Sequence, residues 1–102
     1  MDSLTLITGE GQQVGKGEEF APLAVMARAG GEPAGGQMVS FYVDDPQGTG
    51  TDFQGGSPVM ITTSSNGTGS TDVALVAGAS PGTVQIKVIA DGAHTDFPLE
   101  IV

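Results

Sequence analysis

Three aspartates stand close together in the sequence, around one predicted loop. Asp44 and Asp45 follow a predicted strand at 38–43, and Asp52 comes shortly afterwards. Calcium takes six to eight oxygen ligands, which carboxylates and backbone carbonyls supply. The three residues are therefore a candidate calcium site. The chain has no D-x-D-x-D-G run, however, and aspartates in turns commonly accept hydrogen bonds from nearby backbone N–H groups. The alternative interpretation is that all three are solvated turn caps.

The residues needed for most enzyme chemistry are missing. His94 is the only histidine, and there is no cysteine, so neither a typical zinc site nor a Cys–His pair is available. A Ser-His-Asp triad needs a histidine held by a buried acid beside an exposed serine, and no G-x-S-x-G turn is present. The glycines at 9–11 are not followed by Gly-Lys-Ser/Thr, which excludes a phosphate-binding loop. The sequence predicts a protein that is not an enzyme and has no cofactor except, in the first hypothesis, calcium.

Binding through exposed side chains is a second possibility. Tyr42 lies next to Asp44 and Asp45, and with Asp52 these residues form the candidate binding surface. Several apolar residues fall on the polar parity of their predicted strands, where a neighbouring module or a partner could cover them. They are Met26, Met38, Tyr42, Met60 and Ile89. Because the chain has no Trp, stacking against a sugar ring is disfavoured.

The charge excludes several partners. Twelve acidic residues against three lysines and arginines give a formal net charge of −9. Nucleic-acid binding requires basic surfaces that contact phosphates, so we expect no nucleic-acid partner. No apolar run approaches the roughly 20 residues of a membrane-spanning helix, and we expect no direct membrane insertion.

Alternating apolar residues indicate strands separated by turns. Gly, Pro, Asn and Asp gather in the turns, and Asn66-Gly67 and Asp91-Gly92 are typical of two-residue hairpins, the former of type I′. At 102 residues the chain suits one domain, 1–102. Short strands with a turn every 8–12 residues predict an all-β, antiparallel, immunoglobulin-like sandwich of seven to eight strands. The predicted strands are 4–8, 20–29, 38–43, 51–53, 59–63, 71–77, 83–90 and a last strand containing Phe97, Leu99 and Ile101.

Three segments resemble the bacterial immunoglobulin-like repeats of invasins and intimins, and the resemblance covers the whole chain. A Gly/Pro turn before a V-x-F strand matches Gly31, Pro33, Gly36, Val39 and Phe41. A T-D-x-x-G-x-A segment matches at Thr63 and Gly67, with Ser64 and Gly69 in place of the usual Asp and Ala. A strand of alternating apolar residues after a glycine matches Gly82, Val84, Ile86 and Val88.

The resemblance implies a non-enzymatic structural or adhesion module, a spacer or display domain within a larger protein. Its partners would be neighbouring immunoglobulin-like modules or a surface or virion protein. Its location would be the outside or surface of a bacterium, or a phage virion. Two alternatives stay open: a module that binds a carbohydrate or a host receptor, and a stand-alone decoration protein of a phage capsid or tail.

Overall fold

A long hairpin forms the centre of the larger sheet. In the computed structural model, which describes residues 3–8, 12–56, 58–71, 73–90 and 92–102, β10 (Gly82–Ala90) pairs along its whole length with β11 (Ala93–Ile101). Val84, Ile86 and Val88 are fully buried. Since alternate side chains of a strand point to opposite faces, the alternation in the sequence predicts this buried face correctly. The Asp91-Gly92 hairpin is confirmed by the pairing of Ala90 with Ala93, although Asp91 itself lies outside the described residues.

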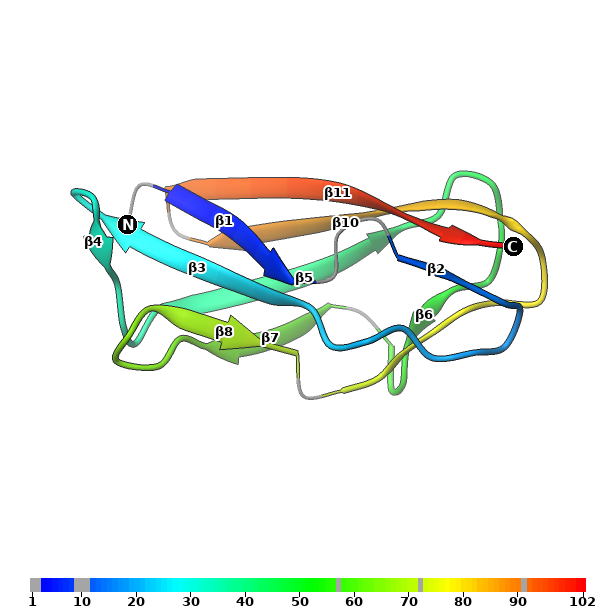
Figure 1. Ribbon diagram of the computed structural model, residues 1–102, viewed down its shortest axis with the longest axis horizontal. Coiled ribbons are helices and arrows are strands. Elements are labelled where there is room, and N and C mark those ends of the chain that lie inside the picture. The colour runs from blue at the N-terminus through cyan, green and yellow to red at the C-terminus, as the bar shows by residue number, and fades with distance from the viewer. Residues whose placement is uncertain (1–2, 9–11, 57, 72, 91) are drawn as a thin grey trace.

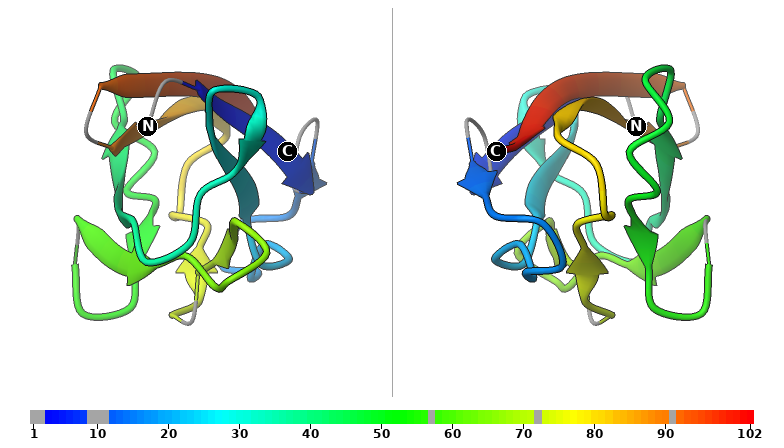
Figure 2. Two further views of the ribbon diagram at one scale, coloured as in Figure 1. Left: turned by 90° about the vertical axis from the view of Figure 1, so that its left-hand side faces the viewer. Right: turned by 90° about the vertical axis from the view of Figure 1, so that its right-hand side faces the viewer.

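Two main sheets enclose one core (Figures 1 and 2). The first contains β1 (Ser3–Thr8), β3 (Ala24–Ala29), β4 (Glu32–Pro33) and β8 (Thr68–Ser70). The second has the order β2-β11-β10-β5-β7, where β2 is Gln13–Val14, β5 is Met38–Asp44 and β7 is Val59–Thr62. A short pair joins β6 (Asp52–Phe53) to β9 (Leu75–Val76).

The core comes from both sheets and from the segments between them. Its largest fully buried side chains are Phe41, Leu23, Ile86, Leu99, Val25, Val39, Val84 and Val88. Burying an aliphatic or aromatic side chain of this size stabilises the fold by about 1.5–3 kcal/mol each. For β3, β5, β10 and β11, the sequence predicted correctly which alternate side chains point into the core.

The sequence predicted seven or eight antiparallel strands, and the structure differs in two respects. The described residues form eleven strand segments, four of which are only two residues long. One pairing is parallel: Glu100 and Ile101 of β11 lie opposite Gln13 and Val14 of β2, in a segment expected to be a loop. The prediction of a purely antiparallel fold was therefore wrong. β2 has only two residues and its sequence neighbours are polar and glycine-rich, so the alternation of apolar residues that indicates a strand is missing.

Asn66-Gly67 does not join a hairpin. β7 pairs with β5 of the larger sheet, whereas β8 pairs with β3 of the smaller one, so the turn crosses between sheets. Among the described residues only glycines have positive φ, so Asn66 cannot adopt a type I′ turn, which needs positive φ at both central residues. Gly67 alone, at φ +83°, takes the left-handed conformation.

Two predicted strands are much shorter than expected. The strand predicted at 20–29 begins at Ala24, because Pro22 has no N–H to donate and the Leu23 N–H donates to the side chain of Thr71 instead. The strand predicted at 71–77 is reduced to β9, since Thr71 is bonded to Leu23 across the fold.

The molecule is elongated, with principal extents of 41 × 19 × 18 Å. The N-terminal strand β1 starts near one end of the long axis, and β11 finishes at the other end (Figure 1). Among the described residues no helix has the length and hydrophobicity needed to cross a membrane.

Candidate functional site

The Asp45 carboxylate organises the loop that follows β5. Oδ1 accepts hydrogen bonds from the backbone N–H and the hydroxyl of Thr49, both at 2.9 Å, and Oδ2 accepts one from the N–H of Gly50 at 2.8 Å. Desolvation alone would raise the pKa of Asp45. The hydrogen bonds from Thr49 and Gly50 outweigh it and leave the pKa below its usual 3.8. The carboxylate therefore acts as a turn cap, with its oxygens already occupied by protein donors.

Two buried threonines extend this loop inward, and the sequence analysis missed them. The hydroxyls of Thr49 and Thr51 lie 2.9 Å apart, and the Thr51 hydroxyl also accepts the Gly78 N–H at 3.0 Å. A Cβ added to Gly78 would lie only 1.8 Å from the backbone oxygen of Thr49. The spacing Asp45-x-x-x-Thr49-Gly50 is a signal for the cap, but nothing local in the sequence indicates the contact with Gly78.

Asp44 and Asp52 have other surroundings. Asp44 forms an ion pair with Lys87 of β10 at 3.5 Å, and both side chains are about half exposed. Asp52 lies on β6, where its Oδ1 accepts the N–H of Phe53 at 2.8 Å. Within the described part of the chain, no group of three or more Asp, Glu, His or Cys side chains is placed to hold a metal ion. The structure thus does not gather Asp44, Asp45 and Asp52 into such a group, and calcium binding by them stays a prediction.

Tyr42 lies on the outer face of the larger sheet and is 39% exposed. Its cross-strand neighbour is Lys87, and Asp44 follows two residues along the same strand, on the same face. Of the four predicted binding residues, therefore, Tyr42 and Asp44 share a face. Asp45 is half-buried in the next loop, and Asp52 belongs to the separate pair β6–β9.

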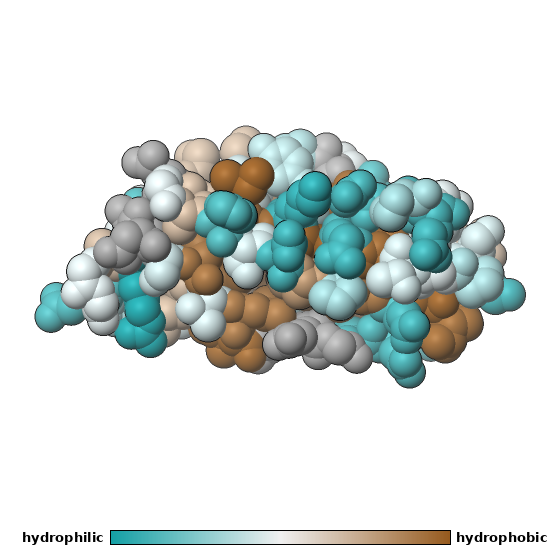
Figure 3. Space-filling view, turned by 90° about the horizontal axis from the view of Figure 1, so that it is seen from above, coloured by the Kyte–Doolittle hydropathy of each residue, from teal (hydrophilic) through white to brown (hydrophobic). Residues whose placement is uncertain are grey.

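His94 lies in β11, opposite Ile89 of β10, and is exposed. On the side of the molecule above β1 and β11, a row of hydrophilic side chains separates smaller hydrophobic spots (Figure 3).

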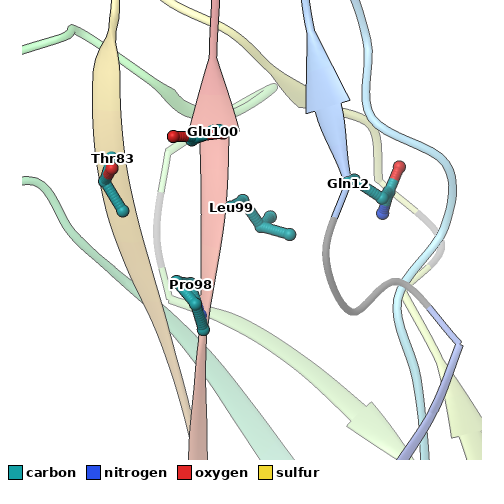
Figure 4. A pocket seen from close by; sticks show the side chains of 5 residues that line it. All are labelled: Gln12, Thr83, Pro98, Leu99 and Glu100. Atoms are coloured by element: carbon teal, nitrogen blue, oxygen red, sulfur yellow. The ribbon is translucent and has the colours of Figure 1, made fainter.

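Two shallow hollows lie away from the predicted site. One, of about 190 Å³, lies where β10 and β11 face the segment before β2 (Figure 4), and it is lined by Gln12, Thr83, Pro98, Leu99 and Glu100. The second, of about 180 Å³, is lined by 19–22, 71 and 73–75. In the first, the four lining residues other than Gln12 belong to β10 and β11, and the Gln12 side chain is also bonded to the backbone of Ala21. Among the described residues that line them, neither hollow has a pair of groups arranged for acid–base or nucleophilic chemistry.

Comparisons with known proteins identify no family for this chain. No family model matches the sequence, and no curated protein matches it either. Among solved structures, the chain is similar to a conjugative transposon lipoprotein from Bacteroides eggerthii DSM 20697, with a TM-score of 0.47 and 11% identity. The match covers 95% of this chain and 94% of that one. Similarity at this level supports no inference about function.

Proposed function

We propose that this chain is an immunoglobulin-like sandwich that serves as a non-enzymatic spacer or display module in a bacterial surface protein or a phage virion protein. The arrangement of the strands supports the immunoglobulin-like assignment. The N-terminal segment contributes β1 to one sheet and β2 to the other, and β7 leads into β8 across the sandwich. Seven strands longer than two residues, β1, β3, β5, β7, β8, β10 and β11, form most of the two sheets. The two-residue strands β2 and β4 extend these sheets, and β6 and β9 form a separate pair.

The elongated shape is the single observation on which the spacer function depends. Because the chain enters near one end of a 41 Å axis and leaves at the other, modules joined in series extend in one direction. A rigid β-sandwich keeps that distance, and its end loops stay free to contact a neighbour. The partners in this proposal are adjacent modules of the same kind or a surface or virion protein.

Small-angle X-ray scattering of three directly joined copies tests the geometry. We expect the maximum dimension to grow by nearly 41 Å for each added copy. The matched control joins the copies through long Gly/Ser linkers, which behave as flexible coils and give a broad distribution of dimensions. A compact particle, with copies folded back on one another, would argue against the spacer.

The native context is tested by immunoblotting cells and purified phage particles of the source with an antibody against this domain. The proposal expects a large polypeptide at the cell surface or in the virion. A species near 10.2 kDa that copurifies with particles would instead identify a stand-alone decoration protein.

A further inference from the structure

The charged residues of this acidic chain are unevenly distributed. Residues 33–43 and residues 53–71 contain no Asp, Glu, Lys, Arg or His, although the chain as a whole has a net charge of −9. These two stretches contain β5 and β7, apart from Asp44 at the end of β5. The register places them side by side, with Val39 opposite Ile61 and Phe41 opposite Val59. The fold therefore places the uncharged strand β7 beside the uncharged part of β5, at one edge of the larger sheet.

This region, which we name the uncharged edge, consists of 38–43 of β5 and 59–62 of β7. Its outer face carries three large apolar side chains, Met38, Tyr42 and Met60, together with Ser40 and Thr62. Ser40 lies between Met60 on one side and Ile89 of β10 on the other, and Met38 and Tyr42 lie before and after it along β5. Met38, Met60 and Ile89 are 62%, 60% and 47% exposed. Apolar side chains gathered in this way typically mark an interaction surface.

The edge itself is also open. In the described part of the chain, β7 has one ladder partner, β5, and it lies at the lower rim of the molecule in Figure 1, away from β11. Proteins usually protect an edge strand with charged side chains, and a lysine is the common choice. Val59-Met60-Ile61-Thr62 has no charge, so no electrostatic repulsion from the strand itself opposes pairing with another strand.

We propose that the uncharged edge is a self-association surface, where β7 pairs antiparallel with β7 of a second copy and extends the sheet across a two-fold axis. Such an interface is self-complementary, because each copy offers the same strand to the other. The charge distribution indicates that the partner at this edge is a second copy of the chain. Two chains of net charge −9 repel each other, and β7 is a place where they can meet without bringing carboxylates together. A basic partner would be attracted instead to the acidic outer residues Asp96 and Glu100 of β11, on the far side of the sheet.

Light scattering and sedimentation of the single module, over a range from micromolar to millimolar protein, test the proposal. We expect the wild-type mass to rise from one chain to two and then to stop. Met60→Glu should weaken the association at least about tenfold, which corresponds to about 1.4 kcal/mol, because it places two like charges on the same face of the joined sheet, close to the two-fold axis. Ile7→Glu is the matched control, since Ile7 is 48% exposed but lies in β1 of the other sheet. It changes the net charge equally and should leave the dimer intact.

Met60→Lys, with Ile7→Lys as its control, makes the test independent of the sign of the charge. Both Met60 variants should weaken the dimer if β7 meets β7. A monomer at all concentrations, a dimer that tolerates Met60→Glu, or a mass that grows beyond two chains would each overturn the proposal. A stronger association in Met60→Lys would also overturn it, because the edge would then be contacting an acidic surface. The outcome is independent of the tandem-copy measurement, which concerns the ends of the molecule.

Discussion

At the residue scale, two neighbouring aspartates have different roles. Asp45 accepts three hydrogen bonds and fixes the loop that contains the buried Thr49. Asp44 forms one exposed ion pair with Lys87. Hydrogen bonds to a charged group are worth more than those between neutral groups, whereas exposed ion pairs contribute little. The adjacent residues therefore form a natural pair for comparison.

We expect Asp45→Ala to lower the free energy of unfolding by about 1.5–3 kcal/mol, because it removes the acceptor of three hydrogen bonds. The control, Asp44→Ala, should cost no more than about 1 kcal/mol, since its ion pair is solvent-screened. Urea unfolding at pH 7 measures both. Equal losses in the two variants would mean that the Asp45 cap is not structurally important.

The cap should also make stability depend on pH. Because the folded pKa of Asp45 lies below the unfolded value of 3.8, the folded protein binds a proton less readily than the unfolded chain. The contribution is complete above pH 3.8 and is lost as the pH falls through the folded pKa. The difference in unfolding free energy between wild type and Asp45→Asn should therefore shrink below pH 3.8. A difference that stays constant from pH 7 to pH 2.5 would contradict this assignment.

At the element scale, the turn between β7 and β8 depends on Gly67. Its carbonyl accepts the Ala27 N–H at 2.8 Å, and an added Cβ would lie 2.8 Å from the Ala27 oxygen and 2.9 Å from Pro33 Cβ. The side-chain oxygen of Asn66 accepts bonds from the backbone and hydroxyl of Thr68 and from the hydroxyl of Ser64, which shape the rest of the turn. Gly67 therefore has both a positive φ and no space for a side chain.

Gly67→Ala should cost more than about 2 kcal/mol, because backbone strain of about 1–2 kcal/mol adds to a clash with atoms that cannot move freely. Gly55→Ala is the control: its φ is +89°, but nothing lies within 4 Å of the added Cβ, so only the strain applies. Thermal and urea unfolding of the two variants separate strain from packing. If Gly55→Ala costs as much as Gly67→Ala, the packing argument fails.

The sequence predicted those elements whose signal is local. Alternation of Val84, Ile86 and Val88 determined the buried face of β10, and the same reasoning placed Val39 and Phe41 inside and Tyr42, Met38 and Met60 outside. It failed for β2, whose strand conformation depends on pairing with β11, far away in the chain. It failed for Asn66-Gly67 because a dipeptide does not reveal which sheet the next strand joins.

In the candidate site, too, the sequence predicted the features that have a local signal and missed those that depend on tertiary contacts. Exposure of Tyr42 follows from strand parity, and capping by Asp45 follows from its position in a turn. Proximity in sequence, in contrast, did not bring Asp44, Asp45 and Asp52 together, because a strand end, a loop and a separate two-stranded pair direct them differently. Buried contacts such as Thr51 with Gly78 depend on tertiary packing and have no local signal.

At the scale of the whole molecule, the net charge opposes folding. Twelve acidic residues against three basic ones repel one another in the compact state, and salt screens that repulsion. We expect the melting temperature to rise by roughly 2–5 °C between 10 mM and 300 mM NaCl, equivalent to a change of less than about 1 kcal/mol. Glu32→Gln, which neutralises an exposed charge, should raise stability at low salt and much less at high salt. A melting temperature independent of salt would show that the charges are too far apart to matter.

The pairing of β2 with β11 determines how the molecule would respond to a pulling force. The two strands run parallel, joined by hydrogen bonds from Glu100 N to Gln12 O at 3.0 Å and from Val102 N to Val14 O at 2.8 Å. Tension applied to the two ends of the chain draws β2 and β11 in opposite directions along their own axes. The bonds between them are then sheared simultaneously and cannot open one after another like a zipper, so the domain should hold its length under load until they rupture together.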